Sequence, residues 1–481
     1  MKKTLFAVIA IAIVLSGACF AQQSEGSKII DGFTYDNIEW SVPQVGKDVQ
    51  REVLDNGIVL YMMEDHRLPL FNISAIIRCG DAYVPLEMMA VPDFTGSVMR
   101  SGGTVNIPAD SLNAILELIG GSIETRIGEE DGTARLNVMS KDTELGIKLF
   151  ADVMRNPAFP QDKIDLLKSQ NKNRIKRRND NPGGILSREW YHVVYGDHPY
   201  GRILEWAYVK DITTEDLKAY HDKYFAPNNL MLGITGDFDP KKVKKLLNKY
   251  FGDWKKKDIP TMEMPKVAEE PKPGVYQLYK DINQANIRFG HLGVTRDNPD
   301  RYAIAVMNYI LGGGSFTSRM TTSVRSNEGL AYSVYSSFNT RSTEPGTFNA
   351  GTQTKSATAH KALGLMMDEI NRIRTAPVDD DELEGAKDSY INRYVFEFDT
   401  PGDIVERLMR LEFDNRPADE LQKYIENIRA VTKDDVLRVA KEYLKPKDMT
   451  IMVVGKPDDF DAPLDDFGTI TTLEITEPVL Q

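Results

Sequence analysis

The sequence lacks any apolar run long enough to cross a membrane after its first residues. A helix that spans the hydrocarbon core needs about 20 consecutive apolar residues, and no later stretch approaches that length. We therefore expect no transmembrane segment in the mature protein. The apolar run from Leu5 to Leu15 follows Lys2 and Lys3 and is too short to span permanently, so residues 1–21 are predicted to be a secretory signal peptide.

Cysteine is scarce as well, with two in 481 residues. Cleavage after Ala21 removes Cys19 and leaves Cys79 without an internal partner in an oxidising compartment, which excludes an internal disulfide. We therefore expect the protein to be exported and periplasmic, with packed cores as the source of its stability. The stretch Ser16–Cys19 also resembles an imperfect lipoprotein box, so an envelope form anchored by lipid through Cys19 is the alternative interpretation.

Positive charge is outnumbered, with 59 Lys and Arg against 71 Asp and Glu and a formal net charge of −12. Removing residues 1–21 deletes two lysines and no acids, which takes the charge from −12 to −14. This balance argues against nucleic acid or anionic lipid as the main partner. About 460 mature residues exceed the size of a single hydrophobic core, so several domains are expected.

The chain contains an internal repeat at an offset of 219 residues. In each copy a Thr precedes a helical stretch with an acidic first turn, a Pro stops the helix, and a short buried strand ends in Gly. The first copy is Thr213, Asp216, Leu217, Tyr224, Pro227 and the strand 230–236; the second is Thr432, Asp435, Val436, Tyr443, Pro446 and the strand 449–455. The chain therefore consists of two related halves.

Composition and periodicity place these halves at 22–254 and 275–481, joined by a linker at 255–274 that is rich in Lys, Pro and Glu. Residues 53–63 around Asn56-Gly57 and residues 70–79 alternate like paired antiparallel strands. Residues 112–118, 143–155 and 162–178 have helical spacing. Strands mixed with helices predict the α+β class, with about two α/β sandwiches in each half.

The second half carries a set of motifs that together identify a family. They are Gln284–Gly290, Asn308–Gly314, Ser318–Met320, Val324-Arg325 and Glu328–Val334, and the first half adds Leu54–Gly57, Gly103-Thr104 and His198–Gly201. This combination resembles the insulinase/pitrilysin-type metallopeptidases, including the bacterial processing-peptidase type. The resemblance covers nearly all of the mature chain and implies two homologous halves that close like a clamshell around an extended peptide.

In that family zinc is bound by an His-x-x-Glu-His motif and a distant glutamate. Alignment on Gly103-Thr104 places Asp93, Gly96 and Ser97 at the three chemical positions of the motif. A shift of one residue does not restore it, because no histidine lies between His66 and His192. The distant glutamate falls near residues 171–176, which contain no acid. The resemblance therefore implies a degenerate metal site and no zinc in this chain.

The family's substrate-binding pair is retained as Arg325 and Tyr332, an arginine and a tyrosine seven residues later. The resemblance implies a non-catalytic, substrate-binding subunit, inactive alone, that supplies this pair to a zinc-bearing homologue hydrolysing extended peptides, with self-association left open. The alternative is a scaffold protein that uses the inactive peptidase fold. An independently active peptidase is disfavoured, because no metal site or nucleophile can be located.

Four further features have structural interpretations that we prefer to functional ones. Gly312–Gly314 is expected to end a helix with close backbone packing, since no Lys-Ser/Thr follows it as in a phosphate loop. His198 is expected to be structural rather than to pair with His192 on a metal. The basic run 174–178 is expected to be a solvated helix face, and Cys79 a buried small hydrophobe.

Overall fold

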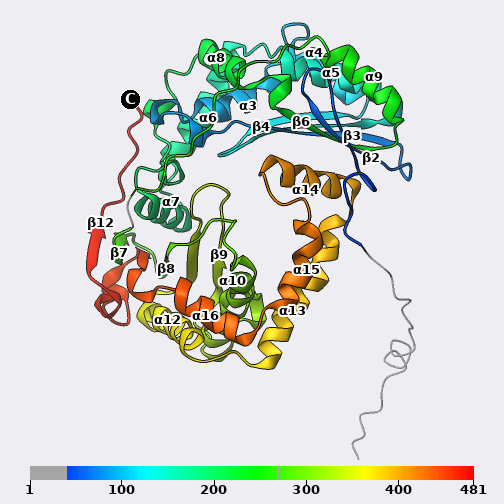
Figure 1. Cartoon of the computed structure of the whole chain (residues 1–481). Helices are drawn as coiled ribbons and strands as arrows, with labels where there is room; N and C mark the ends of the chain where they lie inside the picture. Colours follow the sequence, from blue (N-terminus) through cyan, green and yellow to red (C-terminus); the bar gives the residue numbers. More distant parts are fainter. Residues whose placement is uncertain (1–40, 269–270) are drawn as a thin grey trace, which may run out of the picture. The chain divides into compact units, whose positions relative to one another are not determined.

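The structure, a computed structural model, describes residues 41–268 and 271–481 of the chain (Figure 1). Residues 43–481 form one compact unit, to which all elements below belong. The expected signal peptide and Cys19 lie outside the described residues. None of the helices in the described ranges is both long and apolar enough to span a bilayer.

The first half is built around one six-stranded sheet in the order β1-β2-β6-β3-β5-β4. β1 and β2 form the expected hairpin, in which Gly57 has a left-handed φ of 93°. The expected pairing of β2 with β3 is wrong, because the buried strand β6 lies between them, parallel to β2 and antiparallel to β3. The strands are β1 (Gln50–Val53), β2 (Val59–Glu64), β3 (Leu70–Ile77), β4 (Ser122–Ile127), β5 (Gly132–Met139) and β6 (Leu230–Gly236).

The second half repeats this topology in a sheet of order β12-β7-β11-β8-β10-β9. β7 runs parallel to β11, and β8 is antiparallel to both β11 and β10, as their counterparts are in the first half. The two sheets differ in one edge strand. In the first half this strand is β1, which comes before the other strands in the chain and forms an antiparallel hairpin with β2; in the second half it is β12, which comes after the others and runs parallel to β7. The strands are β7 (Gly274–Tyr279), β8 (Gln284–Leu292), β9 (Ala331–Phe338), β10 (Thr347–Lys355), β11 (Thr450–Gly455) and β12 (Ile470–Leu473).

Helices pack against both sheets, and each half has its own hydrophobic core. In the first half the helices are α3 (Val91–Ser101), α4 (Ala109–Leu118), α5 (Thr143–Arg155), α6 (Gln161–Lys176), α7 (Pro182–Tyr195), α8 (Thr214–Tyr224) and α9 (Pro240–Phe251). In the second they are α10 (Arg301–Asn308), α11 (Arg319–Thr321), α12 (Ala359–Thr375), α13 (Asp380–Tyr394), α14 (Pro401–Phe413), α15 (Glu420–Ala430) and α16 (Lys433–Tyr443). The α+β class and the two related halves are confirmed, but the described residues place one sheet in each half instead of two sandwiches.

The two halves exchange one helix each. α7 of the first half packs on β8 and β11 of the second, and α14 of the second half packs on β2, β3 and β6 of the first (Figure 1). These helices begin at Pro182 and Pro401, which are separated by the same 219 residues as the rest of the repeat. Trp190 Nε1 on α7 donates to the carbonyl of Thr450, 3.1 Å away. A Cβ on Gly233 would lie 2.6 Å from Val405 on α14, so a glycine in β6 permits the close approach.

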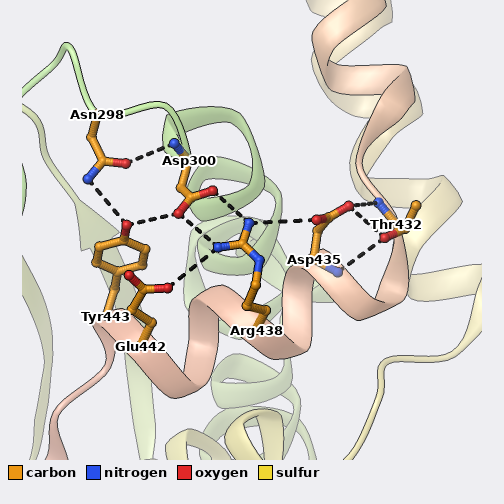
Figure 2. Close-up of polar contacts among 7 residues, drawn as sticks. All are labelled: Asn298, Asp300, Thr432, Asp435, Arg438, Glu442 and Tyr443. Carbon is orange, nitrogen blue, oxygen red and sulfur yellow. Dashed lines mark hydrogen bonds and ion pairs between the residues drawn. The ribbon is translucent and has the colours of Figure 1, made fainter.

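The repeated Thr is an N-cap in both copies, as expected. Thr213 and Thr432 each form a capping box with the Asp three residues later. In the second copy Arg438 extends this box into a network (Figure 2), because it binds Asp300 at 2.6 Å and lies 3.6 Å from Asp435. Tyr443 also donates to Asp300, at 2.8 Å. The network ties α16 to the start of α10 and has no counterpart in the first copy, where the position of Arg438 is Ala219.

The chain between α9 and β7 contains no helix or strand in its described residues, 252–268 and 271–273. It is fixed to the first half by His198, whose Nε2 donates to the carbonyl of Pro265 at 2.8 Å while Nδ1 accepts from the backbone of Tyr200. His198 is buried, which lowers the pKa of its ring. The structural role expected of His198 is therefore confirmed.

Two other structural interpretations also hold. Cys79 is fully buried beneath Tyr220, and burial raises the pKa of its thiol. The basic run 174–178 covers the end of α6 and the two residues after it, and its charged side chains are mostly exposed. The partly buried one, Arg178, pairs with Glu205 at 2.7 Å.

Candidate functional site

The three degenerate metal positions lie on α3, beside the edge strand β4. Asp93 and Ser97 are half-buried, and Gly96 is buried. Burial raises the pKa of Asp93, while the positive charges of Arg174 and Arg126 oppose that shift. The charges that surround Asp93 therefore include two guanidinium groups, which would repel a dication.

Gly96 sits where the family has the glutamate that activates water, and the position has no room for a side chain. A Cβ there would lie 2.3 Å from the backbone nitrogen of Ile127 and 2.8 Å from the carbonyl carbon of Arg126. Thr125 holds the contact by donating its hydroxyl to the carbonyl of Gly96 at 2.6 Å. α3 thus packs directly on the backbone of β4, and the site is closed by packing as well as changed in sequence.

The stretch expected to hold the third metal ligand lies on α6, which packs against α3. Asn171 is buried, donates to the carbonyl of Leu167 at 3.0 Å and accepts from Arg174 at 2.6 Å. No group of three or more His, Cys, Asp or Glu side chains suited to a metal occurs within residues 41–268 and 271–481. The residues present do not fit a zinc ion.

Arg325 and Tyr332, the expected substrate-binding pair, are brought together. Arg325 lies in the π-helical turn η9 (Thr322–Asn327), and Tyr332 is the second residue of β9. Gly329, with a left-handed φ of 64°, ends the helical turn and leads the chain into the strand. The guanidinium carbon of Arg325 is 4.6 Å from the centre of the Tyr332 ring. In the part of the chain that the structure describes, Arg325 has no carboxylate within ion-pair distance, so its donors remain available.

Tyr332 projects from an irregular edge strand. β9 pairs with β10 on one side, and its other edge is unpaired by any strand that the structure describes. The register shifts at Tyr332 and Ser333, which together face the single residue Gln353, so the strand bulges there. Thr352 and Thr354 stabilise the bulge, because their hydroxyls donate to the carbonyls of Ser333 and Leu330 at 2.9 and 2.8 Å. Bulges re-aim side chains, and the Tyr332 ring is 83% exposed.

A third residue of this site was missed by sequence reasoning. The ring of Phe316 lies 4.4 Å from the guanidinium carbon of Arg325 and is 64% exposed. It follows Ser315, whose φ of 54° places a non-glycine residue in the left-handed region at a cost of about 1 kcal/mol or more. The signal available in the sequence was an aromatic residue directly after a glycine run in a polar stretch.

The glycine run itself has the structural role expected of it. Gly312 lies in the π-helical turn η7 (Tyr309–Gly313) that ends α10, and a Cβ there would meet the backbone nitrogen of Ser336 at 2.6 Å. The helix end therefore packs directly on β9, which positions the Phe316 turn beside Arg325. No phosphate-loop geometry is involved.

A cavity of about 1640 Å³ is lined by residues of both halves, but not by Arg325, Tyr332 or the degenerate metal positions. Ion pairs join the halves around it, including Arg341 with Glu129, and Arg410 with Asp131 at 2.5 Å. Other charged residues of its lining also form ion pairs, as Arg296 does with Asp414 and Arg407 with Glu397. We therefore assign the candidate site to the region of Arg325, whose guanidinium has no ion-pair partner among the described residues, and not to this cavity.

Comparison with known proteins agrees with this geometry. The model of the family described as "Insulinase (Peptidase family M16)" matches residues 97–206, and that of the "Peptidase M16 inactive domain" matches residues 211–390. An uncharacterized zinc protease of Streptomyces coelicolor is 24% identical over 353 residues, covering 71% of this chain and 76% of the relative. An uncharacterized zinc protease of Bacillus subtilis is 23% identical over 291 residues, covering 60% of this chain and 69% of the relative.

Solved structures show the same fold. The peptidase M16 inactive domain from Pseudomonas fluorescens has a TM-score of 0.77 and 25% identity, covering 85% of this chain and 98% of its own. A protease from Helicobacter pylori has a TM-score of 0.74 and 17% identity, covering 84% and 99%. With both family models matched along one chain and the repeated sheets observed, this protein belongs to the insulinase family, peptidase family M16, as a member whose residues do not fit the zinc site.

Proposed function

We propose that this chain is the non-catalytic, substrate-binding subunit of an exported insulinase-type peptidase. It would supply Arg325 and Tyr332 to a partner chain of the same family that carries zinc. One contrast supports the proposal above all. The position of the water-activating glutamate is closed by packing at Gly96, whereas the half-buried Arg325 lies beside the exposed Tyr332 without a carboxylate partner among the described residues.

The two side chains suit the recognition of a peptide backbone. Arg325 offers charge-assisted donors to a carbonyl oxygen, and the Tyr332 hydroxyl can donate to the oxyanion that develops when that carbonyl is attacked. Tyr332 projects from the edge strand β9, and Arg325 lies beside it in the preceding turn. An extended peptide can pair with such an edge through its main chain. An extended peptide is therefore the proposed substrate class, and neither group can complete hydrolysis without a metal-bearing partner.

Two features support the proposed partner and compartment. The curated relatives from Streptomyces coelicolor and Bacillus subtilis are named zinc proteases, so a zinc-bearing homologue is the natural complement to this chain. Lys2 and Lys3 before the apolar run support export to the periplasm. The two chains should associate through an interface of well over about 1,000 Å², and neither should cleave peptides efficiently alone.

The test is reconstitution of this chain with the zinc-bearing homologue from the same organism. Arg325→Ala and Tyr332→Phe should each leave folding and association intact and lower peptide turnover at least about tenfold, since loss of one oxyanion donor costs on the order of 10²–10³ in other enzymes. The double variant should lose less than the product of the two single effects, because both groups serve one carbonyl.

Matched controls are Arg177→Ala and Tyr279→Phe, an exposed arginine directly after α6 and an exposed tyrosine at the end of β7. Both should leave turnover unchanged. Equal turnover by complexes of wild-type and doubly substituted chain would reduce this protein to a scaffold, the alternative that the fold also permits. One tightly held zinc per purified chain, lost when Asp93 is substituted, would contradict the proposal that this chain is non-catalytic.

A further inference from the structure

Phe316 is an exposed aromatic residue that the protein holds in place. Its turn, Ser315–Thr317, is closed on both sides: Thr317 donates its hydroxyl to the carbonyl of Gly314 at 2.9 Å, and Ser318 donates to the carbonyl of Ser315 at 2.8 Å. Ser315 keeps its left-handed φ inside this turn. Strained conformations persist where the surroundings over-determine them, and they cluster at ligand sites.

Phe316 lies next to the proposed substrate-binding pair, Arg325 and Tyr332. Its ring and the ring of Tyr332 both contact the guanidinium of Arg325, at 4.4 and 4.6 Å from the guanidinium carbon. Aromatic faces attract a guanidinium and hold its plane. Arg325 therefore has its orientation set by two rings while its donors stay open, and the exposed parts of the rings form an apolar surface next to those donors.

A peptide added to the outer edge of β9 would present its side chains to this surface. Side chains of an extended strand alternate between the two faces, so one neighbour of the carbonyl held by Arg325 lies on the same face as Phe316. An apolar side chain would cover the Phe316 ring and remove it from water. A short or acidic side chain would leave the ring exposed.

We propose that Phe316 is a specificity-determining residue: it orients Arg325 and selects a bulky apolar side chain beside the peptide carbonyl that Arg325 and Tyr332 hold. This inference rests on the proposed function and adds to it the preferred substrate side chain. Phe316 itself touches the substrate side chain and acts on the held carbonyl only through Arg325.

The experiment uses the reconstituted complex and three peptides that differ at one position, carrying Leu, Ala or Asp there. Phe316→Ala should lower kcat/KM for the Leu peptide about tenfold, mainly through KM, which is the range expected when an apolar contact is lost. The change for the Ala and Asp peptides, which reports only the orientation of Arg325, should stay below about threefold because the Tyr332 ring still contacts the guanidinium. Compared with Phe316→Ala, Phe316→Tyr keeps the ring and should keep the wild-type preference for the Leu peptide, and Phe316→Leu should keep part of that preference.

Phe396→Ala is the matched control, because Phe396 is also a highly exposed phenylalanine, at 71%, but lies before α14, outside the site. It should not change the preference. Equal losses for all three peptides, or no loss for the Leu peptide, would overturn the assignment of specificity. If Phe316→Ala fails this test but Arg325→Ala and Tyr332→Phe still depress turnover, the proposed function stands and only the specificity role is lost. If those two variants also have no effect, the proposed function itself is contradicted.

Discussion

Arg51 and Glu412, 361 residues apart, form a bidentate ion pair that joins the two halves. Arg51 Nε and Nη2 donate to the two carboxylate oxygens of Glu412 at 2.6 and 2.7 Å. The hydroxyl of Tyr61, a residue whose side chain is almost entirely buried, donates to the same carboxylate at 2.5 Å. Glu412 lies on the exchanged helix α14, so this cluster fixes that helix on the sheet of the first half.

Glu412→Ala should lower the free energy of unfolding by about 1–3 kcal/mol, because it leaves the hydroxyl of Tyr61 without its acceptor. Most of this loss should come from Tyr61, since exposed ion pairs alone contribute about 0–1 kcal/mol. Urea denaturation measures it. Glu406→Ala on the same helix is the control, because the ion pair that Glu406 forms among the described residues is with the exposed Arg135, at 3.3 Å. An equal loss in both variants would contradict the role given to Tyr61.

The sequence predicted the two halves but not how they combine. The repeat was visible because local rules require a cap, a helix stop and a buried strand at each copy, as at Thr213 and Thr432. The exchange of α7 and α14 was not visible, because the apolar faces of these helices do not specify which sheet they cover. One six-stranded sheet per half was missed for a related reason: β6 inserts between β2 and β3 from more than 150 residues further along the chain.

Restoring the family's motif residues should not restore zinc binding. In Asp93→His/Gly96→Glu/Ser97→His the glutamate would need the space occupied by the backbone of Ile127, and the third ligand would still be missing on α6. We expect less than 0.1 zinc per chain by elemental analysis after dialysis, an estimate based on the need for at least three protein ligands. Stoichiometric zinc in this variant would show that α3 and β4 separate readily.

Gly96→Ala tests the same packing without any metal chemistry. The added methyl would lie 2.3 Å from a backbone nitrogen, so α3 must shift, and overpacking of this kind typically costs about 1–3 kcal/mol. Gly385→Ala is the control, because a Cβ at that helical position meets nothing within 4 Å and should be neutral or slightly stabilising. Thermal unfolding of both variants measures the difference, and equal melting temperatures would contradict the close contact.

The candidate site was also predicted only in part from the sequence. Arg325 and Tyr332 were predicted because they occur within a dense set of motifs. Phe316 was missed because its exposure depends on the left-handed backbone of Ser315 and on a turn closed by two hydroxyl groups. No spacing rule identifies a non-glycine residue that will adopt that conformation.

Asp81 should make stability depend on pH. Burial, together with the nearby negative charges of Glu129 and Asp93, raises the pKa of Asp81 to about 7, above its unfolded value near 4. The native state therefore holds a proton that the unfolded state has lost, so the carboxyl lowers stability as pH rises from about 4 to about 7, with no further change above that. Asp81→Asn should be more stable than wild type by about 2–4 kcal/mol at pH 8 and by much less at pH 4.5. Urea denaturation at both values checks this, and a pH-independent difference would contradict it.

The exchange of α7 and α14 predicts that the two halves stay together when the chain between them is cut. A protease site inserted after Ala268, an exposed residue of the linker, should be cleaved without change in elution volume at micromolar concentration, because each half then still covers the other's sheet. Trp190 and Met409 occupy equivalent positions of the repeat and are both fully buried. Replacing either by Ala should cost about 2–5 kcal/mol, and the double variant should separate into two fragments or unfold after cleavage. Separation of the cleaved wild-type chain, with both helices intact, would show that the linker and not the exchanged helices holds the halves together.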